Sequence, residues 1–348
     1  MRALWATGGG VLAGCYYYRP VADPGGGPTR HSFFLSPQSV SDDADPEALP
    51  FSVRVGRFFI TPIVICFSRL WLSGTGDFVI RQDPNYEVFL KAAMTRPGPQ
   101  ALITVSNHRS LLDDPPILSS LLPVSYAVRP RFLRVGLCSQ EYCFAGPAIV
   151  NAFFGTGKSL PIWRGGGISQ KLLTDYCRHV AAGEWSHLFP EGGVWQEVFL
   201  GGRKSPVSSM LPCNRLKWGI GRVIAHSPQT PIVIPFFHQG MEEVTPIDTK
   251  TRKTRHINIV GGHRVFVIFG PPVDFSDLIE AHEKEFGPLV KIQASTRTQQ
   301  QALLLSSTLR QDPSPAEFEL YRKITLRVES SLLVLNDEAR RGIKNQSR

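Results

Sequence analysis

The sequence has 348 residues, of which 42% are hydrophobic and 19% charged, a composition that excludes a disordered chain and allows one large domain or two ordinary ones. The formal net charge of +9 indicates phosphate-bearing molecules, an anionic membrane or nucleic acid as a partner, unless the basic surface serves solubility alone. Because aromatic and basic residues do not alternate in a repeated pattern, lipid or phosphate is favoured over nucleic acid.

Residues 1–50 differ from the rest of the chain. They are rich in Pro, Gly and Ser and show no periodicity. Three arginines precede most of the acidic residues, which is typical of a transit peptide, but the run of tyrosines and Asp23 are not. An ordinary disordered leader is therefore the alternative. We expect a variable leader over 1–50 and the folded domain over 51–348.

The most hydrophobic stretch is "RFFITPIVICFSRLWL", residues 57–72. Its apolar run is shorter than the roughly 20 residues that span a bilayer, and it contains a proline and an arginine. It predicts a membrane-associated helix near 58–72 that lies in one leaflet, with Arg57, Arg69 and Trp71 at the level of the headgroups. A buried core helix is the alternative.

From residue 101 onward, predicted strands alternate with predicted helices. The predicted strands are "ALITVSNH", "SLPIW", "SHLF" and "PIVIPFF". The predicted helices are "PPILSSLL", "ISQKLLTDYCRHVAAG" ending at Gly183, "RLKWGIGRVIAH" ending before Pro228, and a C-terminal tail helix over about 316–340. Residues 257–275 predict a hairpin or paired strands. This alternation predicts an α/β fold with a mixed, largely parallel sheet flanked by helices.

Several common kinds of site have no support in the sequence. The six cysteines are scattered, with neither a CxxC pair nor zinc spacing, so we expect reduced thiols without a metal role. No HExxH and no G-x-S-x-G occurs. "GKS" at 157–159 lacks the first glycine of a phosphate-binding loop and precedes a strand rather than a helix. We therefore expect no metal and no nucleotide site.

The stretch "NHRSLLDDPP" places His108 after a predicted strand and Asp113 five residues later. A tight loop between them can bring the two side chains together. The carboxylate then fixes one tautomer of the imidazole, and the other ring nitrogen can accept a proton from an attacking hydroxyl. Asp114 precedes Pro115, as at a helix N-cap. In the alternative interpretation both aspartates only cap the helix and His108 is an ordinary polar residue.

Two further stretches suit the binding of a phosphate-bearing lipid. Arg164 ends a predicted strand beside a run of three glycines, where a guanidinium can hold a phosphate through two hydrogen bonds. "FPEGG" places Glu191 and Gly192 in a tight turn after another strand. Glu191 is predicted either to pair with Arg164 or to orient a glycerol hydroxyl. For each residue alone, a structural ion pair is the alternative.

Taken in order, these blocks resemble the glycerolipid acyltransferases, which share an NHxxxxD block, an Arg block, an FPEG block and a later apolar-Pro block. Residues 51–275 are most similar to the branch that remodels cardiolipin. The resemblance implies a monotopic membrane enzyme that moves acyl chains between phospholipids without a cofactor. The implied acceptor is a lysophospholipid such as monolysocardiolipin. The implied location is a mitochondrial membrane, on the side facing the intermembrane space.

The resemblance also implies residue roles. His108 is the general base and Asp113 orients it, while Arg164, with Glu191 and Gly192, positions the phosphoglycerol part of the substrate. An acyl-CoA-dependent lysophospholipid acyltransferase and a non-catalytic lipid-binding protein remain as alternatives.

One position departs from the family pattern. Gly193 stands where the family usually has a lysine, so one phosphate contact is missing. Arg203, Lys204 and the basic cluster 250–255 are its candidate replacements, although basic loops of this kind are equally typical of a solvated surface.

Overall fold

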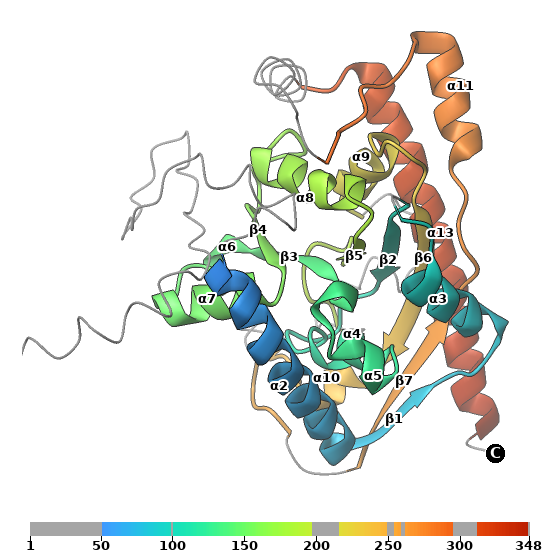
Figure 1. Ribbon diagram of the computed structural model, residues 1–348. Helices are drawn as coiled ribbons and strands as arrows, with labels where there is room; N and C mark the ends of the chain where they lie inside the picture. Colours follow the sequence, from blue (N-terminus) through green and yellow to red (C-terminus); the bar gives the residue numbers. More distant parts are fainter. Residues whose placement is uncertain are drawn as a thin grey trace, which may run out of the picture.

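The computed structural model describes residues 51–98, 100–196, 216–248, 254–258, 262–294 and 312–346. The predicted leader and the basic residues Arg203 and Lys204 lie outside this part of the chain, as does most of the 250–255 cluster. The described residues form one seven-stranded sheet, with the strand order β1-β7-β6-β2-β5-β3-β4, and the helices that pack around it (Figure 1).

The sheet is mixed and largely parallel, as predicted. The parallel strands are β6 (Ile232–Gln239), β2 (Leu102–Ser106), β5 (Trp185–Leu188), β3 (Val135–Ser139) and β4 (Ser159–Ile162). β7 (His263–Phe269) runs antiparallel to β6, and β1 (Gly76–Ile80) runs parallel to β7. Of the hairpin or paired strands predicted over 257–275, the described residues form one strand. β7 is the strand of this range, and its two neighbours come from distant parts of the sequence.

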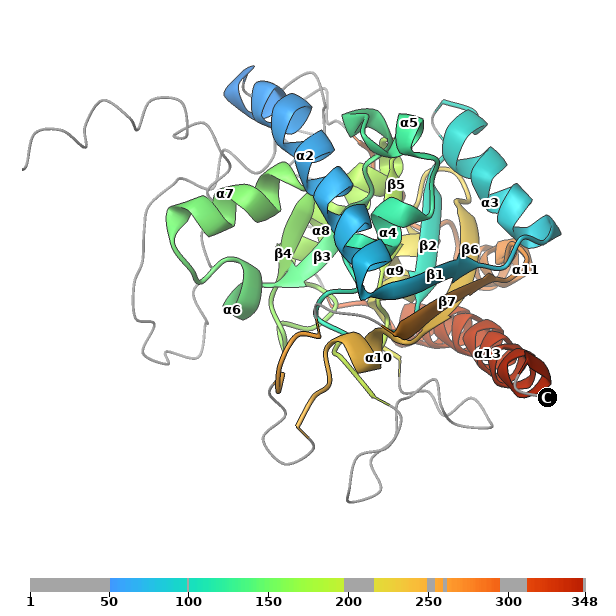
Figure 2. The same cartoon turned by 90° about the horizontal axis from the view of Figure 1, so that it is seen from below.

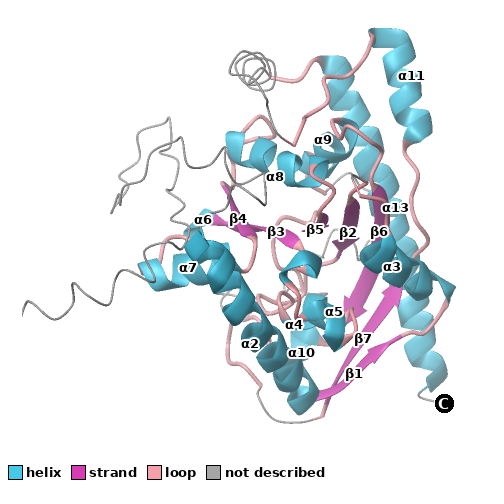
Figure 3. Ribbon diagram, viewed as in Figure 1, coloured by secondary structure: helices cyan, strands magenta, loops and turns pink. Residues whose placement is uncertain are grey.

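Side chains of the central strands alternate between two hydrophobic clusters, one on each face of the sheet. In β2, Leu102 joins one cluster and Ile103 joins the other; in β6, Phe236 and Phe237 divide in the same way. Both faces need apolar residues because helices cover both, which explains why the central strands are continuous apolar runs. Figure 3 shows the strands enclosed by helices, and in Figure 2 α3 and α13 lie on opposite sides of the sheet.

The predicted helices form with small shifts of their ends. On one face lie α8 (Lys171–Ala181), α9 (Gly219–Ala225), α11 (Ser276–Phe286) and the tail helix α13 (Pro315–Gln346), which packs on α9 and β6. The other helical segments are α3 (Pro84–Thr95), α4 (Pro116–Ser120), α5 (Val124–Ala127), the 3-10 turn η2 (Pro130–Phe132), α6 (Gln140–Cys143), α7 (Ala148–Thr156) and α10 (Met241–Val244). Gly183 follows the end of α8 and has φ +78°, as expected of the glycine that terminates a helix.

The apolar N-terminal segment forms α2 (Phe51–Thr75), which is longer than predicted. Within it, Val55–Gly74 is long and apolar enough to cross a membrane, judged by length and composition alone. Arg69, which is predicted at headgroup level, donates to the carbonyls of Ser119 and Leu122 at 2.7 and 2.8 Å. α2 is thus attached to the folded domain along one face.

Candidate active site

Asn107 and His238 lie beside each other near the carboxyl ends of the neighbouring strands β2 and β6. The Asn107 side chain donates to the His238 carbonyl at 2.8 Å and accepts from the His238 backbone N–H at 3.0 Å. Because Asn107 is completely buried, these two bonds hold the chain firmly just beyond β2. His108, the next residue, therefore leaves the sheet from a fixed position.

His108 and Asp113 are joined by a hydrogen bond of 2.8 Å between Nδ1 and Oδ2. The same Oδ2 accepts from the backbone N–H groups of Arg109 at 2.8 Å and Ser110 at 3.0 Å. These bonds close the predicted tight loop and bring the two side chains together. The His108 side chain is 17% exposed and that of Asp113 only 1%, so the carboxylate lies behind the imidazole.

Asp113 is ionised at neutral pH. Burial raises the pKa of this carboxyl, but His238, the hydrogen bond from His108 and the Ser110 backbone together hold it below the usual value. Since a carboxylate only accepts hydrogen bonds, Nδ1 of a neutral His108 carries the hydrogen and Nε2 keeps a lone pair. An imidazole in this tautomer can take a proton from a hydroxyl or an amine through Nε2.

The turn after β5 holds His108 from another side. The Phe189 ring stacks on the His108 ring with centroids 4.1 Å apart and planes 16° apart. Buried Glu191 accepts from the His108 backbone N–H at 3.0 Å. Gly192 has φ +66°, a conformation that glycine adopts without steric cost. The ring and the backbone of His108 are both fixed by this turn.

A cavity of about 800 Å³ opens beside His108, a volume typical of sites for small ligands. Much of its wall is apolar and includes Ile60 and Val64 of α2, Leu118 of α4 and Phe153 of α7. The charged side chains of the wall are those of Asp114, Arg134, Arg164 and Lys217. The cavity can therefore take a ligand that combines an apolar chain with a polar head.

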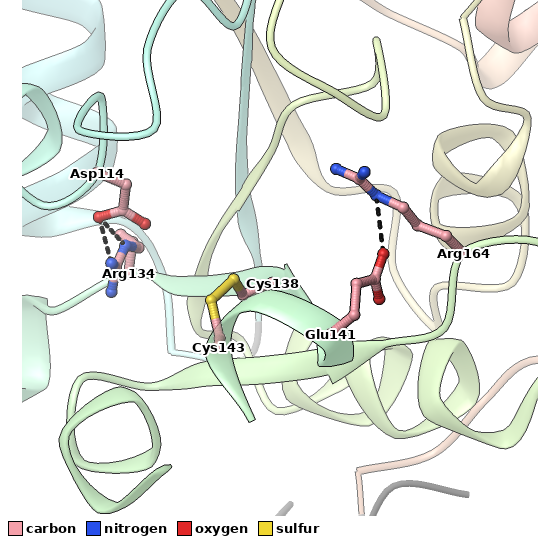
Figure 4. Close-up of a disulfide and its surroundings, with 6 residues drawn as sticks. All are labelled: Asp114, Arg134, Cys138, Glu141, Cys143 and Arg164. Carbon is pink, nitrogen blue, oxygen red and sulfur yellow. Dashed lines mark hydrogen bonds and ion pairs between the residues drawn. A yellow bond between two sulfur atoms is a disulfide. The ribbon is translucent and has the colours of Figure 1, made fainter. Parts of the chain in front are cut away.

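Arg164 and Glu191 do not form the predicted pair. Arg164 lines the cavity and is 47% exposed, and its Nε lies 3.5 Å from Oε1 of Glu141 (Figure 4). Its guanidinium also lies over the Tyr142 ring, 5.1 Å from the ring centroid. Glu191 instead accepts a hydrogen bond from the His108 backbone and is not part of the cavity wall. The glutamate that partners Arg164 thus comes from α6, which the sequence did not predict.

Asp114 does not cap a helix, in contrast to the prediction. The residue before α4 is Pro115, and it offers no side-chain cap. Asp114 instead forms an ion pair with buried Arg134, which also donates to the Gly157 carbonyl at 2.6 Å (Figure 4). This pair ties the loop that follows His108 to β3, so the charge of each residue is neutralised by the other.

Two cysteines of the cavity wall, Cys138 and Cys143, are joined in a disulfide between β3 and α6 (Figure 4). The prediction that all cysteines are reduced thiols is therefore wrong for this pair. The sequence lacked the usual CxxC signal, and a separation of five residues reaches bonding distance only because α6 turns back on β3. Cys66 and Cys177 are free.

His238 is the main site residue that the sequence analysis did not single out. Its Nε2 lies 3.0 Å from the Asn107 carbonyl oxygen and 3.5 Å from Oδ2 of Asp113. A carbonyl oxygen only accepts, so Nε2 of His238 carries the hydrogen. Burial lowers the pKa of His238, which keeps the ring neutral. Asp113 is thus placed between two histidine rings, an arrangement that needs the spatial neighbourhood of β2 and β6.

Comparison with known proteins identifies similar sequences over most of the described fold. The Acyltransferase family matches residues 90–238. N-acylphosphatidylethanolamine synthase of Arabidopsis thaliana is 36% identical over 191 residues, 55% of this chain and 62% of that protein. Tafazzin of Drosophila melanogaster is 30% identical over 283 residues, 75% of this chain and 68% of that protein.

A second protein of the same name, from Dictyostelium discoideum, is 33% identical over 150 residues, which are 42% of this chain and 47% of that protein. The chain therefore spans between about half and two thirds of the length of these three relatives. The matched range of the family includes β2, the turn after β5 and most of β6, the elements that hold His108 and Asp113.

Proposed function

Because the chain belongs to the tafazzin-type glycerolipid acyltransferases, we propose that it transfers an acyl chain from a phospholipid to a lysophospholipid, with His108 as general base. The observation that carries this proposal is the position of His108. Its ring faces an apolar cavity, while its Nδ1 is held by the buried carboxylate of Asp113 at 2.8 Å. A base at the wall of an apolar cavity is what acyl transfer between lipids requires.

In the proposed reaction, Nε2 of His108 takes the proton of the acceptor hydroxyl while that oxygen attacks the ester carbonyl of the donor. Asp113 stabilises the imidazolium that forms. The imidazolium then returns its proton to the oxygen of the leaving lysophospholipid. General base catalysis of this kind contributes about 10²- to 10⁴-fold to a rate. Arg164 and Gly192 line the same cavity and are proposed to contact the phosphoglycerol part of the substrate.

We propose that the acyl donor is a phospholipid and that no cofactor takes part. One ester is exchanged for another, so the reaction has little net driving force and needs none from a thioester. Acyl-CoA is the alternative donor.

The amine of phosphatidylethanolamine is a second candidate acceptor. Support for it comes from the relative named N-acylphosphatidylethanolamine synthase, at 36% identity. An amine nucleophile, like a hydroxyl, must lose a proton to a base, so the same geometry of His108 serves both.

Acyl transfer by the purified full chain in liposomes tests this function. A chain-labelled phosphatidylcholine serves as donor, with a lysophospholipid or phosphatidylethanolamine as acceptor, each with and without acyl-CoA. We expect labelled diacyl product without acyl-CoA. If product formed only with acyl-CoA, acyl-CoA would be the donor in place of the phospholipid. If the product were N-acylated, the amine of phosphatidylethanolamine would be the acceptor in place of the lysophospholipid. No product across several acceptors and bilayer compositions, with the protein bound to the liposomes, would favour a non-catalytic lipid-binding protein.

Membrane attachment through α2 is proposed from the two faces of this helix. One face lines the cavity, so lipid cannot surround the helix on all sides, and a position along the surface of one leaflet fits better than a span. The other face carries large apolar side chains that are 62–74% exposed: Phe58, Phe59, Ile63, Phe67 and Leu70. Such an exposed apolar stripe is typical of a surface that enters a membrane.

Replacing Phe59 and Phe67 with aspartate is expected to weaken liposome binding at least about 10-fold, since insertion of each ring is worth about 1.5–3 kcal/mol. Co-sedimentation with anionic liposomes measures this. The matched control is Phe286→Asp with Val334→Asp, which adds equal charge to exposed apolar positions on α11 and α13. Equal binding by both double variants would assign membrane attachment to another surface.

The acceptor monolysocardiolipin and a mitochondrial membrane facing the intermembrane space complete the proposed function. Both rest on membership of the tafazzin family. Fractionation of cells that express the full chain, followed by protease treatment of intact and swollen mitochondria, tests the location.

A further inference from the structure

Lys217 is tied to the same turn that holds His108. Its backbone N–H donates to the Pro190 carbonyl at 2.7 Å, between Phe189, which stacks on the His108 ring, and Glu191, which accepts from the His108 backbone. The Lys217 side chain lines the cavity, together with Gly192 and Gly193. This lysine is therefore placed by the backbone of the site and is not an arbitrary surface residue.

The lysine side chain lies directly against Gly192. A Cβ atom built on Gly192 would come within 2.8 Å of Cγ and 2.9 Å of Cε of Lys217, closer than such atoms approach. Gly192 thus leaves room for the Lys217 side chain, and its φ of +66° adds a second reason for glycine at this position. The turn and the lysine fit together as one surface of the cavity.

The charges of the cavity wall are balanced except at Lys217. Arg134 is paired with Asp114, and Arg164 lies 3.5 Å from Glu141. Among the described residues, no carboxylate forms an ion pair with Lys217, which is exposed to the cavity. One positive charge is therefore left uncompensated near His108, and an ammonium group on a flexible side chain is well suited to a phosphate.

We propose that Lys217 binds a lipid phosphate. This inference rests on the proposed acyl transfer, and it names a contact that the sequence analysis had assigned to other basic residues. Of those, Arg203 and Lys204 lie outside the described residues, and Arg255 is paired with Asp248 at 3.2 Å. The shared ligand chemistry is a phosphate of the lysophospholipid acceptor or of the phospholipid donor.

Lys217→Gln tests the proposal because glutamine keeps much of the side chain over Gly192 but removes the charge. With the full chain in liposomes, the apparent KM for the phosphate-bearing substrate should rise about 5- to 10-fold, with kcat changed less than about 2-fold. Lys217→Arg should restore the wild-type KM. Varying acceptor and donor separately shows which phosphate Lys217 binds. Lys284→Gln, an equal loss of charge at an exposed position on α11, should leave both KM values unchanged.

A binding measurement separates failure of this inference from failure of the proposed function. In the His108→Ala background, where no transfer is expected, detergent-solubilised protein is titrated calorimetrically with hexanoyl lysophosphatidate and with monohexanoylglycerol. Lys217→Gln should weaken binding of the first about 5- to 10-fold and leave the second unchanged. This result would support the phosphate site even if the wild-type protein transfers no acyl chain. Equal affinity of the lysophosphatidate for both proteins would overturn the proposal, whatever the activity.

Discussion

Replacing His108 with alanine is expected to lower the rate of acyl transfer at least about 10³-fold, close to the upper range for loss of a general base. Among the charged side chains of the cavity wall, Asp114 is held by Arg134, while Arg134, Arg164 and Lys217 are cations without a lone pair to accept a proton, so none of them is a ready substitute. The initial rate of transfer in liposomes, with donor and acceptor both saturating, measures the effect on kcat.

The fold should tolerate this change. When the His108 ring is removed, Oδ2 of Asp113 keeps the backbone N–H donors of Arg109 and Ser110, so the buried carboxylate remains hydrogen-bonded. Liposome binding and the thermal unfolding midpoint should therefore stay near the wild-type values. His256→Ala, at an exposed histidine outside the cavity wall, is the matched control and should keep full activity. Transfer by His108→Ala at the wild-type rate would exclude His108 as the base.

The parts of the site that are local in sequence were predictable. His108 and Asp113 are five residues apart, and a loop after a strand needs only its own backbone donors to bring them together. The order of alternating strands and helices likewise gave the fold class, because a buried strand and an amphipathic helix each leave a pattern within about ten residues. The amphipathic tail helix was found for the same reason.

The parts of the site that depend on distant segments were not predictable. Asn107 and His238 are 131 positions apart and meet only because β2 and β6 are neighbours in the sheet. The pairing of Arg164 with Glu141 depends on α6, a helix of four residues that is too short to leave a periodic signal. Lys217 reaches the cavity through one backbone bond to Pro190, which no sequence pattern records.

The contacts between α2 and the domain were not predictable for a related reason. A window of hydrophobicity reports how apolar a segment is but not which face meets the protein. Arg69 was expected at the membrane surface. Its side chain donates hydrogen bonds to the carbonyls of Ser119 and Leu122, near the end of α4. The arginine therefore attaches the helix to the domain, and the exposed stripe on the other face is left for the proposed membrane contact.

Asp113→Asn is expected to lower kcat about 10²- to 10⁴-fold with little change in KM, because Asp113 acts through His108 and does not line the cavity. Asparagine can keep an oxygen on the Arg109 and Ser110 amides and so preserve the loop. Since the same oxygen also accepts from Nδ1 of His108, the tautomer of His108 is kept, and the variant loses the negative charge that stabilises the imidazolium. Initial rates over a range of acceptor concentrations separate kcat from KM.

The pH dependence of stability gives an independent test of the Asp113 charge. The folded pKa of Asp113 lies below its usual value, since His238, His108 and the Ser110 backbone outweigh the effect of burial. Its contribution to stability is therefore fully present above the unfolded value of 3.8 and is lost as the pH falls through the lower, folded pKa. Urea unfolding from pH 7 to pH 3 should show a smaller acid-induced loss of stability for Asp113→Asn than for the wild type. Asp77→Asn, at an exposed position on β1, should lose as much stability as the wild type. Wild-type kcat in Asp113→Asn, together with an unchanged pH profile of unfolding, would show that the charge of Asp113 supports neither the reaction nor the fold.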